Sequence, residues 1–107
     1  VNNENYYLLE ILDALKDFKT IPDLDKQSAI TLLKNMIIKL TDNELSKMVR
    51  YALKYPPRTK ALLGAILEFS MKKNSIQDLR TNLNPLTSYS LGIEEEALPT
   101  AQKWNIN

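Results

Sequence analysis

The residues of this sequence that could do chemistry are mainly the lysines, arginines and tyrosines of its middle third. Residues 44–80 carry eight basic residues against three acidic ones, a net charge of +5, whereas residues 1–43 and 81–107 each carry a net charge of −2. The total of +1 over 107 residues therefore conceals a basic middle between two acidic ends. A cluster of positive charge of this kind is typical of surfaces that bind phosphate, nucleic acid or an acidic protein.

The strongest candidate binding surface follows from helical spacing within this middle third. Residues three or four positions apart share a face of a helix, and two further cations follow the Pro-Pro corner, near the positive end of the next helix. Such a surface could hold phosphate, a nucleic-acid backbone or an acidic partner, with the rings of Tyr51 and Tyr55 adding stacking. The alternative interpretation is a solvated helix face whose charges keep the protein soluble. We call this set the basic face: Lys47, Arg50, Tyr51, Lys54, Arg58 and Lys60.

Catalytic, metal-binding and cofactor-binding sites are not predicted. The chain has no histidine and no cysteine, which excludes disulfides, thiolate zinc sites and histidine-dependent nucleophiles. The triplet Glu94–Glu96 could bind a hard cation but lacks the spacing of a calcium loop, so an exposed charge cluster is the simpler interpretation. Carboxylate pairs such as Asp13 and Asp17, or Asp23 and Asp25, could suggest hydrolysis, but they fit solvent-facing and helix-capping roles better. The prediction is a protein that is not an enzyme.

The elements that must position these residues are helices. Apolar residues recur at spacings of three and four throughout the chain, and two glycines and few alternating runs argue against a sheet. Thr41 to Glu44 has the form of a capping box, and Pro57 suits the first position of a helix. The patterns predict helices over about 4–18, 24–40, 42–54 and 57–72, and a short one from about 75 to 82.

The predicted fold is a single all-α domain over residues 1–107, a four- to five-helix bundle of two helical hairpins with an irregular C-terminal strap. The helix over 57–72 is apolar nearly all round, so we expect it to be buried. The wide apolar face over 24–40 predicts neighbours on two sides. Gly64 lies on a small-residue strip with Ala61 and Ala65, which predicts a close crossing there. We expect Trp104 to pack the C-terminal tail onto the body.

Two further expectations concern location and completeness. No window approaches the roughly 18 apolar residues of a membrane span, and the polar, acidic N-terminus lacks the basic start of a secretory signal. A cytoplasmic location without membrane attachment is therefore the default. A chain that starts at Val1 fits methionine removal, a trimmed chain or a fragment of a longer protein.

Two stretches of the sequence resemble a known group of bacterial proteins. These are Tyr55-Pro-Pro-Arg-Thr-Lys-Ala-Leu-Leu-Gly-Ala-Ile-Leu-Glu68, and the tail from Leu83-Asn-Pro-Leu-Thr to Leu98-Pro-Thr-Ala-Gln-Lys-Trp-Asn-Ile106. Together they resemble the C-terminal part of small proteins related to antitoxins of abortive-infection (type IV) toxin–antitoxin pairs. The resemblance implies a partner-facing or accessory part. It carries no catalytic motif, and the winged-helix DNA-binding domain usual in such antitoxins has no counterpart in this sequence.

The main functional hypothesis is therefore a bacterial helical interaction module that binds a protein partner or forms a homodimer. Its basis is the excess of apolar helix surface over 24–40 and 57–72 without a chemical site beside it. The alternative is nucleic-acid or phosphate binding through the basic face. A carboxylate hydrolase is the third hypothesis.

Overall fold

The fold is all-α in a computed structural model that describes residues 6–70, 76–81, 83, 86–91, 93 and 98–106. Five α-helices and two short 3₁₀ helices account for most of these residues, and no strand occurs among them. The all-α prediction is confirmed. In chain order the elements are α1 (Tyr6–Lys16), η2 (Phe18–Thr20), α2 (Asp23–Ile38), α3 (Asp42–Ala52), α4 (Pro57–Phe69), α5 (Ile76–Thr81) and η3 (Ala101–Trp104).

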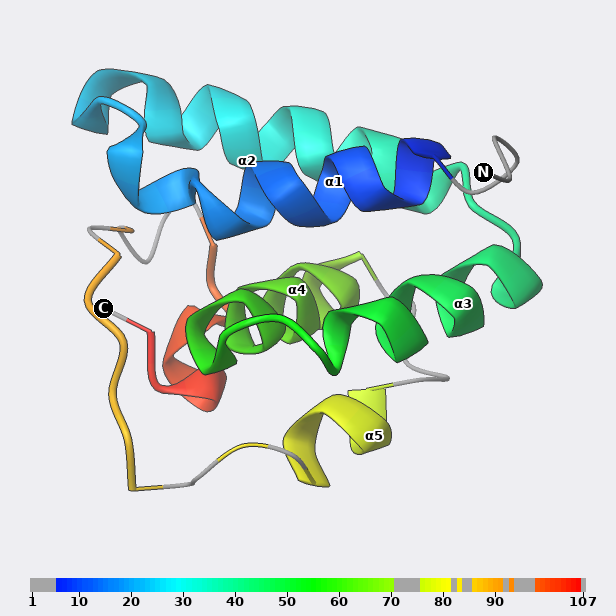
Figure 1. Cartoon of the computed structure of the whole chain (residues 1–107). Coiled ribbons are helices and arrows are strands. Elements are labelled where there is room, and N and C mark those ends of the chain that lie inside the picture. The colour runs from blue at the N-terminus through cyan, green and yellow to red at the C-terminus, as the bar shows by residue number, and fades with distance from the viewer. Residues whose placement is uncertain are drawn as a thin grey trace.

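Helix α4 forms the centre of the molecule, with α1 and α2 on one side and α5 on the other (Figure 1). Every residue from Thr59 to Leu67 is buried, as the apolar composition all round the helix predicts. Helix α4 packs against α1, α2, α5 and η3. The hydrophobic core is therefore built around this single helix, and the other elements each contribute one apolar stripe to it.

The helix starts follow local chemistry in the sequence. At α3 the capping box is complete: the Glu44 amide donates to Thr41 Oγ1 at 3.2 Å, and the Thr41 amide donates to Glu44 Oε1 at 2.9 Å. At α4 the helix begins at Pro57, whose missing amide would have had no partner in the first turn. Both predictions are confirmed: the capping box starts α3 after α2, and Pro57 starts α4 after the corner that follows α3.

The predicted arrangement of two hairpins is not confirmed, because the most extensive packing of α1 is against α4 and α3. Tyr7, near the start of α1, donates its hydroxyl to Glu44, near the start of α3. Asp13, in the second half of α1, accepts from Tyr55 just beyond the end of α3. Helices α1 and α3 therefore run in the same direction, side by side (Figure 1).

The C-terminal strap is irregular and is held at several points. Lys26 of α2 donates from Nζ to the Leu91 carbonyl at 2.7 Å, and Thr100 donates from Oγ1 to the Ala65 carbonyl of α4 at 2.6 Å. The Tyr89 amide donates to the Asn105 carbonyl at 2.7 Å, next to an isolated parallel bridge. The described part of the strap is thus an integral layer of the fold.

Trp104 packs the tail onto the body, as predicted. Its side chain is 3% exposed, and a Cβ added to Gly64 of α4 would lie 2.4 Å from its ring. Gly64 therefore allows η3 and α4 to approach closely, which is the crossing expected from the small-residue strip. The guanidinium of Arg80 in α5 lies 4.5 Å from the centroid of the same ring, so Trp104 joins three elements.

In the part of the chain that the structure describes, no helix has the length and apolar character needed to cross a membrane. The triplet Glu94–Glu96 lies outside the described residues.

Candidate functional site

The basic face lies on the outer side of α3 and continues past the corner into α4. The other side of α3 packs into the core through its four buried residues, Leu45, Met48, Val49 and Ala52. The predicted cations therefore lie on the solvent side. Arg50 is exposed there. Lys47 and Tyr51 are half-buried, and Lys54 and Arg58 are exposed.

Lys60 differs from the other members of the basic face because it is only 8% exposed. It lies within the buried segment of α4, two residues after Arg58. The solvent-accessible cations of the basic face are therefore Arg50, Lys54 and Arg58. Among the described residues, these three make no ion pair, so their charge is available to a ligand.

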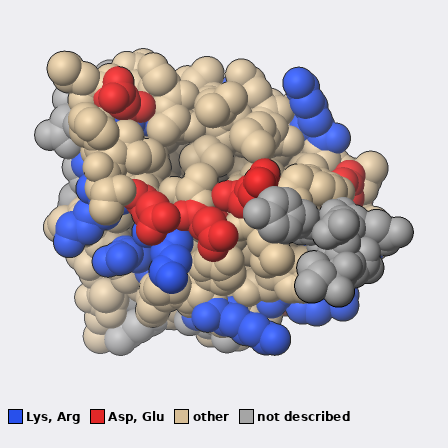
Figure 2. Space-filling model, turned by 45° about the horizontal axis from the view of Figure 1, so that its top comes forward, with Lys and Arg blue, Asp and Glu red and all other residues tan. Residues whose placement is uncertain are grey.

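An acidic stripe borders the basic face. Glu10 and Asp13 of α1, and Asp17 just beyond its end, are exposed and spaced three and four residues apart, so they share one side of this segment. Helix α1 packs against α3, and Figure 2 shows carboxylates in a band across one face of the molecule with lysines and arginines beside it. Because these carboxylates lower the local positive potential, the surface is less favourable for a polyanion than the net charge of +5 in the sequence suggests.

Tyr55, which the sequence offered as a stacking residue, has a different role. It is half-buried and donates its hydroxyl to Asp13 Oδ1 at 2.8 Å, so it connects α1 with the segment after α3. Burial, the hydrogen bond to Asp13 and the negative charge of Asp13 together raise the pKa of the Tyr55 phenol from 10.0 to about 12. The Tyr55 phenol therefore contributes to the contact between α1 and the segment after α3.

This contact predicts a specific loss of stability at alkaline pH. The raised pKa means that the folded state favours the neutral phenol. The contribution of this neutral phenol to the free energy of unfolding is therefore fully present below pH 10.0 and is lost as the pH rises through about 12. We expect Tyr55→Phe to remove this part of the alkaline decline in the free energy of unfolding, as measured by urea denaturation at several pH values. Asp13→Asn should bring the phenol's titration, followed by phenolate absorbance, closer to pH 10. Identical pH profiles for wild type and Tyr55→Phe would contradict the prediction.

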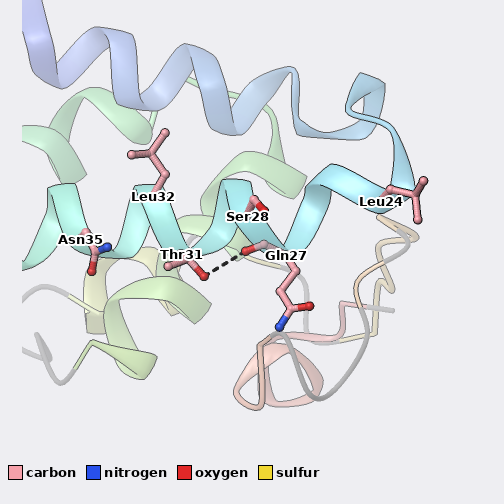
Figure 3. Close-up of a pocket in the computed structure, with 6 residues that line it drawn as sticks. All are labelled: Leu24, Gln27, Ser28, Thr31, Leu32 and Asn35. Carbon is pink, nitrogen blue, oxygen red and sulfur yellow. Dashed lines mark hydrogen bonds between the residues drawn. The ribbon is translucent and has the colours of Figure 1, made fainter.

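A second candidate site lies on the solvent side of α2, and we call it the outer face of α2. Three large apolar side chains are exposed there: Leu24 at 94%, Leu32 at 62% and Ile38 at 43%. Four positions on the same side of the helix, Gln27, Ser28, Thr31 and Asn35, are exposed and polar but uncharged, and the charged Asp25 and Lys39 lie on its flank. Figure 3 shows side chains of this face projecting from successive turns of α2, around a shallow open depression, with Leu24 directed away from the rest of the molecule. The members of the face are Leu24, Gln27, Ser28, Thr31, Leu32, Asn35 and Ile38.

The sequence indicated excess apolar surface over 24–40 but not which side chains are exposed, because hydrophobic spacing alone cannot tell a buried stripe from an exposed one. The expectation of two covering neighbours is met only in part. Ala29 and Met36 pack partly buried against the core, whereas Leu32 and Ile38 face solvent. One feature of the sequence could have indicated this face: residues 27–33 contain no charged residue. A face of an ordinary exposed helix usually carries charges.

Neither face has the composition of a metal centre. Among the described residues, no group of three or more histidine, cysteine, aspartate or glutamate side chains is placed to hold a metal ion. In comparisons with known proteins, no family model, no curated protein and no solved structure matches this chain. The basic face and the outer face of α2 are therefore the features that bear on function.

Proposed function

We propose that this chain is a non-enzymatic helical interaction module that binds a protein partner or a second copy of itself through the outer face of α2. The observation that carries the proposal is the exposure of Leu24, Leu32 and Ile38 on a face whose other members are uncharged. Several large apolar side chains exposed on one helix, with uncharged residues between them, suit an interaction site. The equally apolar α4 is buried from Thr59 to Leu67, so the exposed apolar side chains of α2 are the ones that a partner would cover.

The test compares charge introduced on this face with equal charge introduced elsewhere. Leu24→Glu/Leu32→Glu should abolish self-association, or binding to a co-purified partner, because it places two carboxylates in the contact. The fold should survive, since both positions face solvent. The control Ser46→Glu/Gln102→Glu adds charge at exposed positions of α3 and η3 and should leave association unchanged. Sedimentation velocity gives the mass, and circular dichroism gives the helix content. A compact wild-type monomer without a co-purifying partner would contradict the proposal.

A second candidate function, binding of nucleic acid or phosphate through the basic face, is supported by the exposed Arg50, Lys54 and Arg58, which make no ion pair with the residues that the structure describes. Three phosphate contacts predict that log K falls with log salt at a slope of about −3 on duplex DNA. Arg50→Glu/Arg58→Glu should remove most of this binding in a titration by fluorescence anisotropy. Lys16→Glu/Lys19→Glu, at exposed positions, makes the same change in net charge and serves as the control. Unchanged affinity in the arginine variant would exclude this function.

The relation to proteins associated with type IV antitoxins is a further part of the proposal. It is supported by the packing of the two resembling stretches against each other, through the contact of Trp104 with Gly64 and the hydrogen bond from Thr100 to Ala65. In this proposal the two stretches form one structural unit, and α2 presents the partner-facing surface. A neighbouring gene for a nucleotidyltransferase-like toxin would support the relation.

A further inference from the structure

We propose that the occupant of the outer face of α2 is a second copy of this chain, packed with its α2 antiparallel about a twofold axis near Thr31 and Leu32. This inference rests on the proposed function and names its partner. Helix α2 lies along one edge of the molecule (Figure 1), where a second helix can approach it. Three features of the outer face of α2 bear on such a pair: the spacing of its residues, its charges and its size.

The spacing of the face matches a seam between two helices. Leu24, Thr31 and Ile38 are seven residues apart, with Gln27, Ser28 and Asn35 between them, which is the repeat of a left-handed helix pair. In an antiparallel pair centred on Thr31, positions equally far from Thr31 lie opposite one another. Leu24 of each copy then meets Ile38 of the other, and Thr31 meets its counterpart. Each exposed leucine at the start of α2 thereby gains an apolar neighbour, and polar side chains meet in the middle.

Charges beside the seam favour the antiparallel direction. Asp25, Leu32 and Lys39 are also seven residues apart, so they form a row along one flank of the seam, and all three are exposed. In an antiparallel pair this flank faces the same flank of the second copy. With the axis near Thr31, Leu32 lies within one helical turn of the second copy's Leu32, and Asp25 lies within one turn of its Lys39 at both ends of the contact. A parallel pair would instead place this flank against the opposite flank of the second copy, where Lys39 would lie beside Lys34 and Asp25 would face no cation.

The size of the face predicts a weak, concentration-dependent dimer. Helix α2 has 16 residues and is about 24 Å long. One face of such a helix offers less than the roughly 800 Å² per partner that is usual for stable complexes. We therefore expect monomer and dimer to exchange, with the dimer populated only at high protein concentration.

The decisive experiment uses the absence of cysteine from the wild-type chain. A disulfide needs Cα atoms within about 7 Å, so Thr31→Cys at the twofold axis should form a disulfide-linked dimer under mild oxidation. Ser46→Cys, exposed on α3, is the matched control and should remain largely monomeric. Equal cross-linking of the two variants would overturn the proposed contact.

Charge reversal tests the direction of the pair. Asp25→Lys and Lys39→Asp should each weaken dimerisation by about tenfold in sedimentation equilibrium, because each places like charges opposite one another. The double variant Asp25→Lys/Lys39→Asp should restore the wild-type affinity, since opposite charges face one another again. An antiparallel pair requires this restoration, and its absence would overturn the inference.

The same measurements separate this inference from the proposed function. A wild-type chain that stays monomeric up to about 1 mM, a concentration at which only very weak contacts remain undetected, overturns the dimer. If such a monomer binds another protein and loses that binding in Leu24→Glu/Leu32→Glu, the proposed function still stands. A dimer that persists unchanged in Leu24→Glu/Leu32→Glu overturns both.

Discussion

Replacing Trp104 with alanine is expected to lower the free energy of unfolding by about 3–5 kcal/mol, the usual cost of removing a large buried aromatic ring. The ring is 3% exposed and fills the space above Gly64 in α4. The Arg80 guanidinium of α5 lies 4.5 Å from its centroid. Its removal would therefore leave a cavity where η3, α4 and α5 meet, and the strap would lose its main anchor.

The matched variant is Trp104→Phe, which keeps an aromatic ring against Gly64. The Trp104 Nε1 atom is buried and has no hydrogen-bond partner among the described residues, so phenylalanine loses no hydrogen bond and should cost much less than alanine. Urea denaturation followed by circular dichroism is the appropriate measurement, because the only tryptophan of the chain is the residue replaced. A loss below about 1 kcal/mol in the alanine variant, small for a core substitution, would show that the tail does not unfold together with the helices.

Most of the helix boundaries could be predicted because they are set by neighbours in the chain. The capping box at Thr41 starts α3 through two hydrogen bonds within four residues. Pro57 starts α4 through its own fixed geometry. The burial of α4 was also predictable, since a helix that is apolar all round has no side suited to water. Local chemistry and composition thus determine which segments are helical and which helix is central.

The packing between helices could not be predicted in the same way, because it depends on contacts between residues far apart in the sequence. Short links between helices favoured antiparallel neighbours along the chain, but they do not determine which helices pack together. The most extensive packing of α1 is against α4 and α3, and hydrogen bonds across 37 and 42 residues connect α1 with α3 and the segment after it. Lys26 is buried because its ammonium reaches the carbonyl of Leu91, 65 residues away. No periodicity within one helix contains this information.

The same limit explains what was found and missed at the candidate sites. The exposure of Arg50 could be predicted from the sequence, because the apolar stripe on the opposite side of α3 lies within the same helix. The acidic stripe beside it became a neighbour only through the packing of α1 on α3. Leu32 has the spacing of a core residue but is exposed. Which side of α2 packs against the core is therefore known only from the structure.

Replacing Gly64 with alanine should lower the free energy of unfolding by about 1–3 kcal/mol, although alanine is the better helix former by about 1 kcal/mol. The added Cβ would lie 2.4 Å from two atoms of the Trp104 ring and 2.7 Å from a third. The ring has little room to move, because it is buried and carries Arg80 on its face. The overpacking should therefore exceed the gain in helix propensity.

The control for Gly64→Ala changes the ring and leaves the helix as it is. In a Trp104→Leu background the side chain at position 104 is smaller and can adjust, so the same Gly64→Ala substitution should become stabilising by up to about 1 kcal/mol, its helix-propensity value. Urea denaturation of the four proteins in this double-mutant cycle gives the coupling directly. A reversal of sign between the two backgrounds would assign the cost to the contact between Gly64 and Trp104. Stabilisation by Gly64→Ala in both backgrounds would mean that the Trp104 ring does not press on Gly64 of α4.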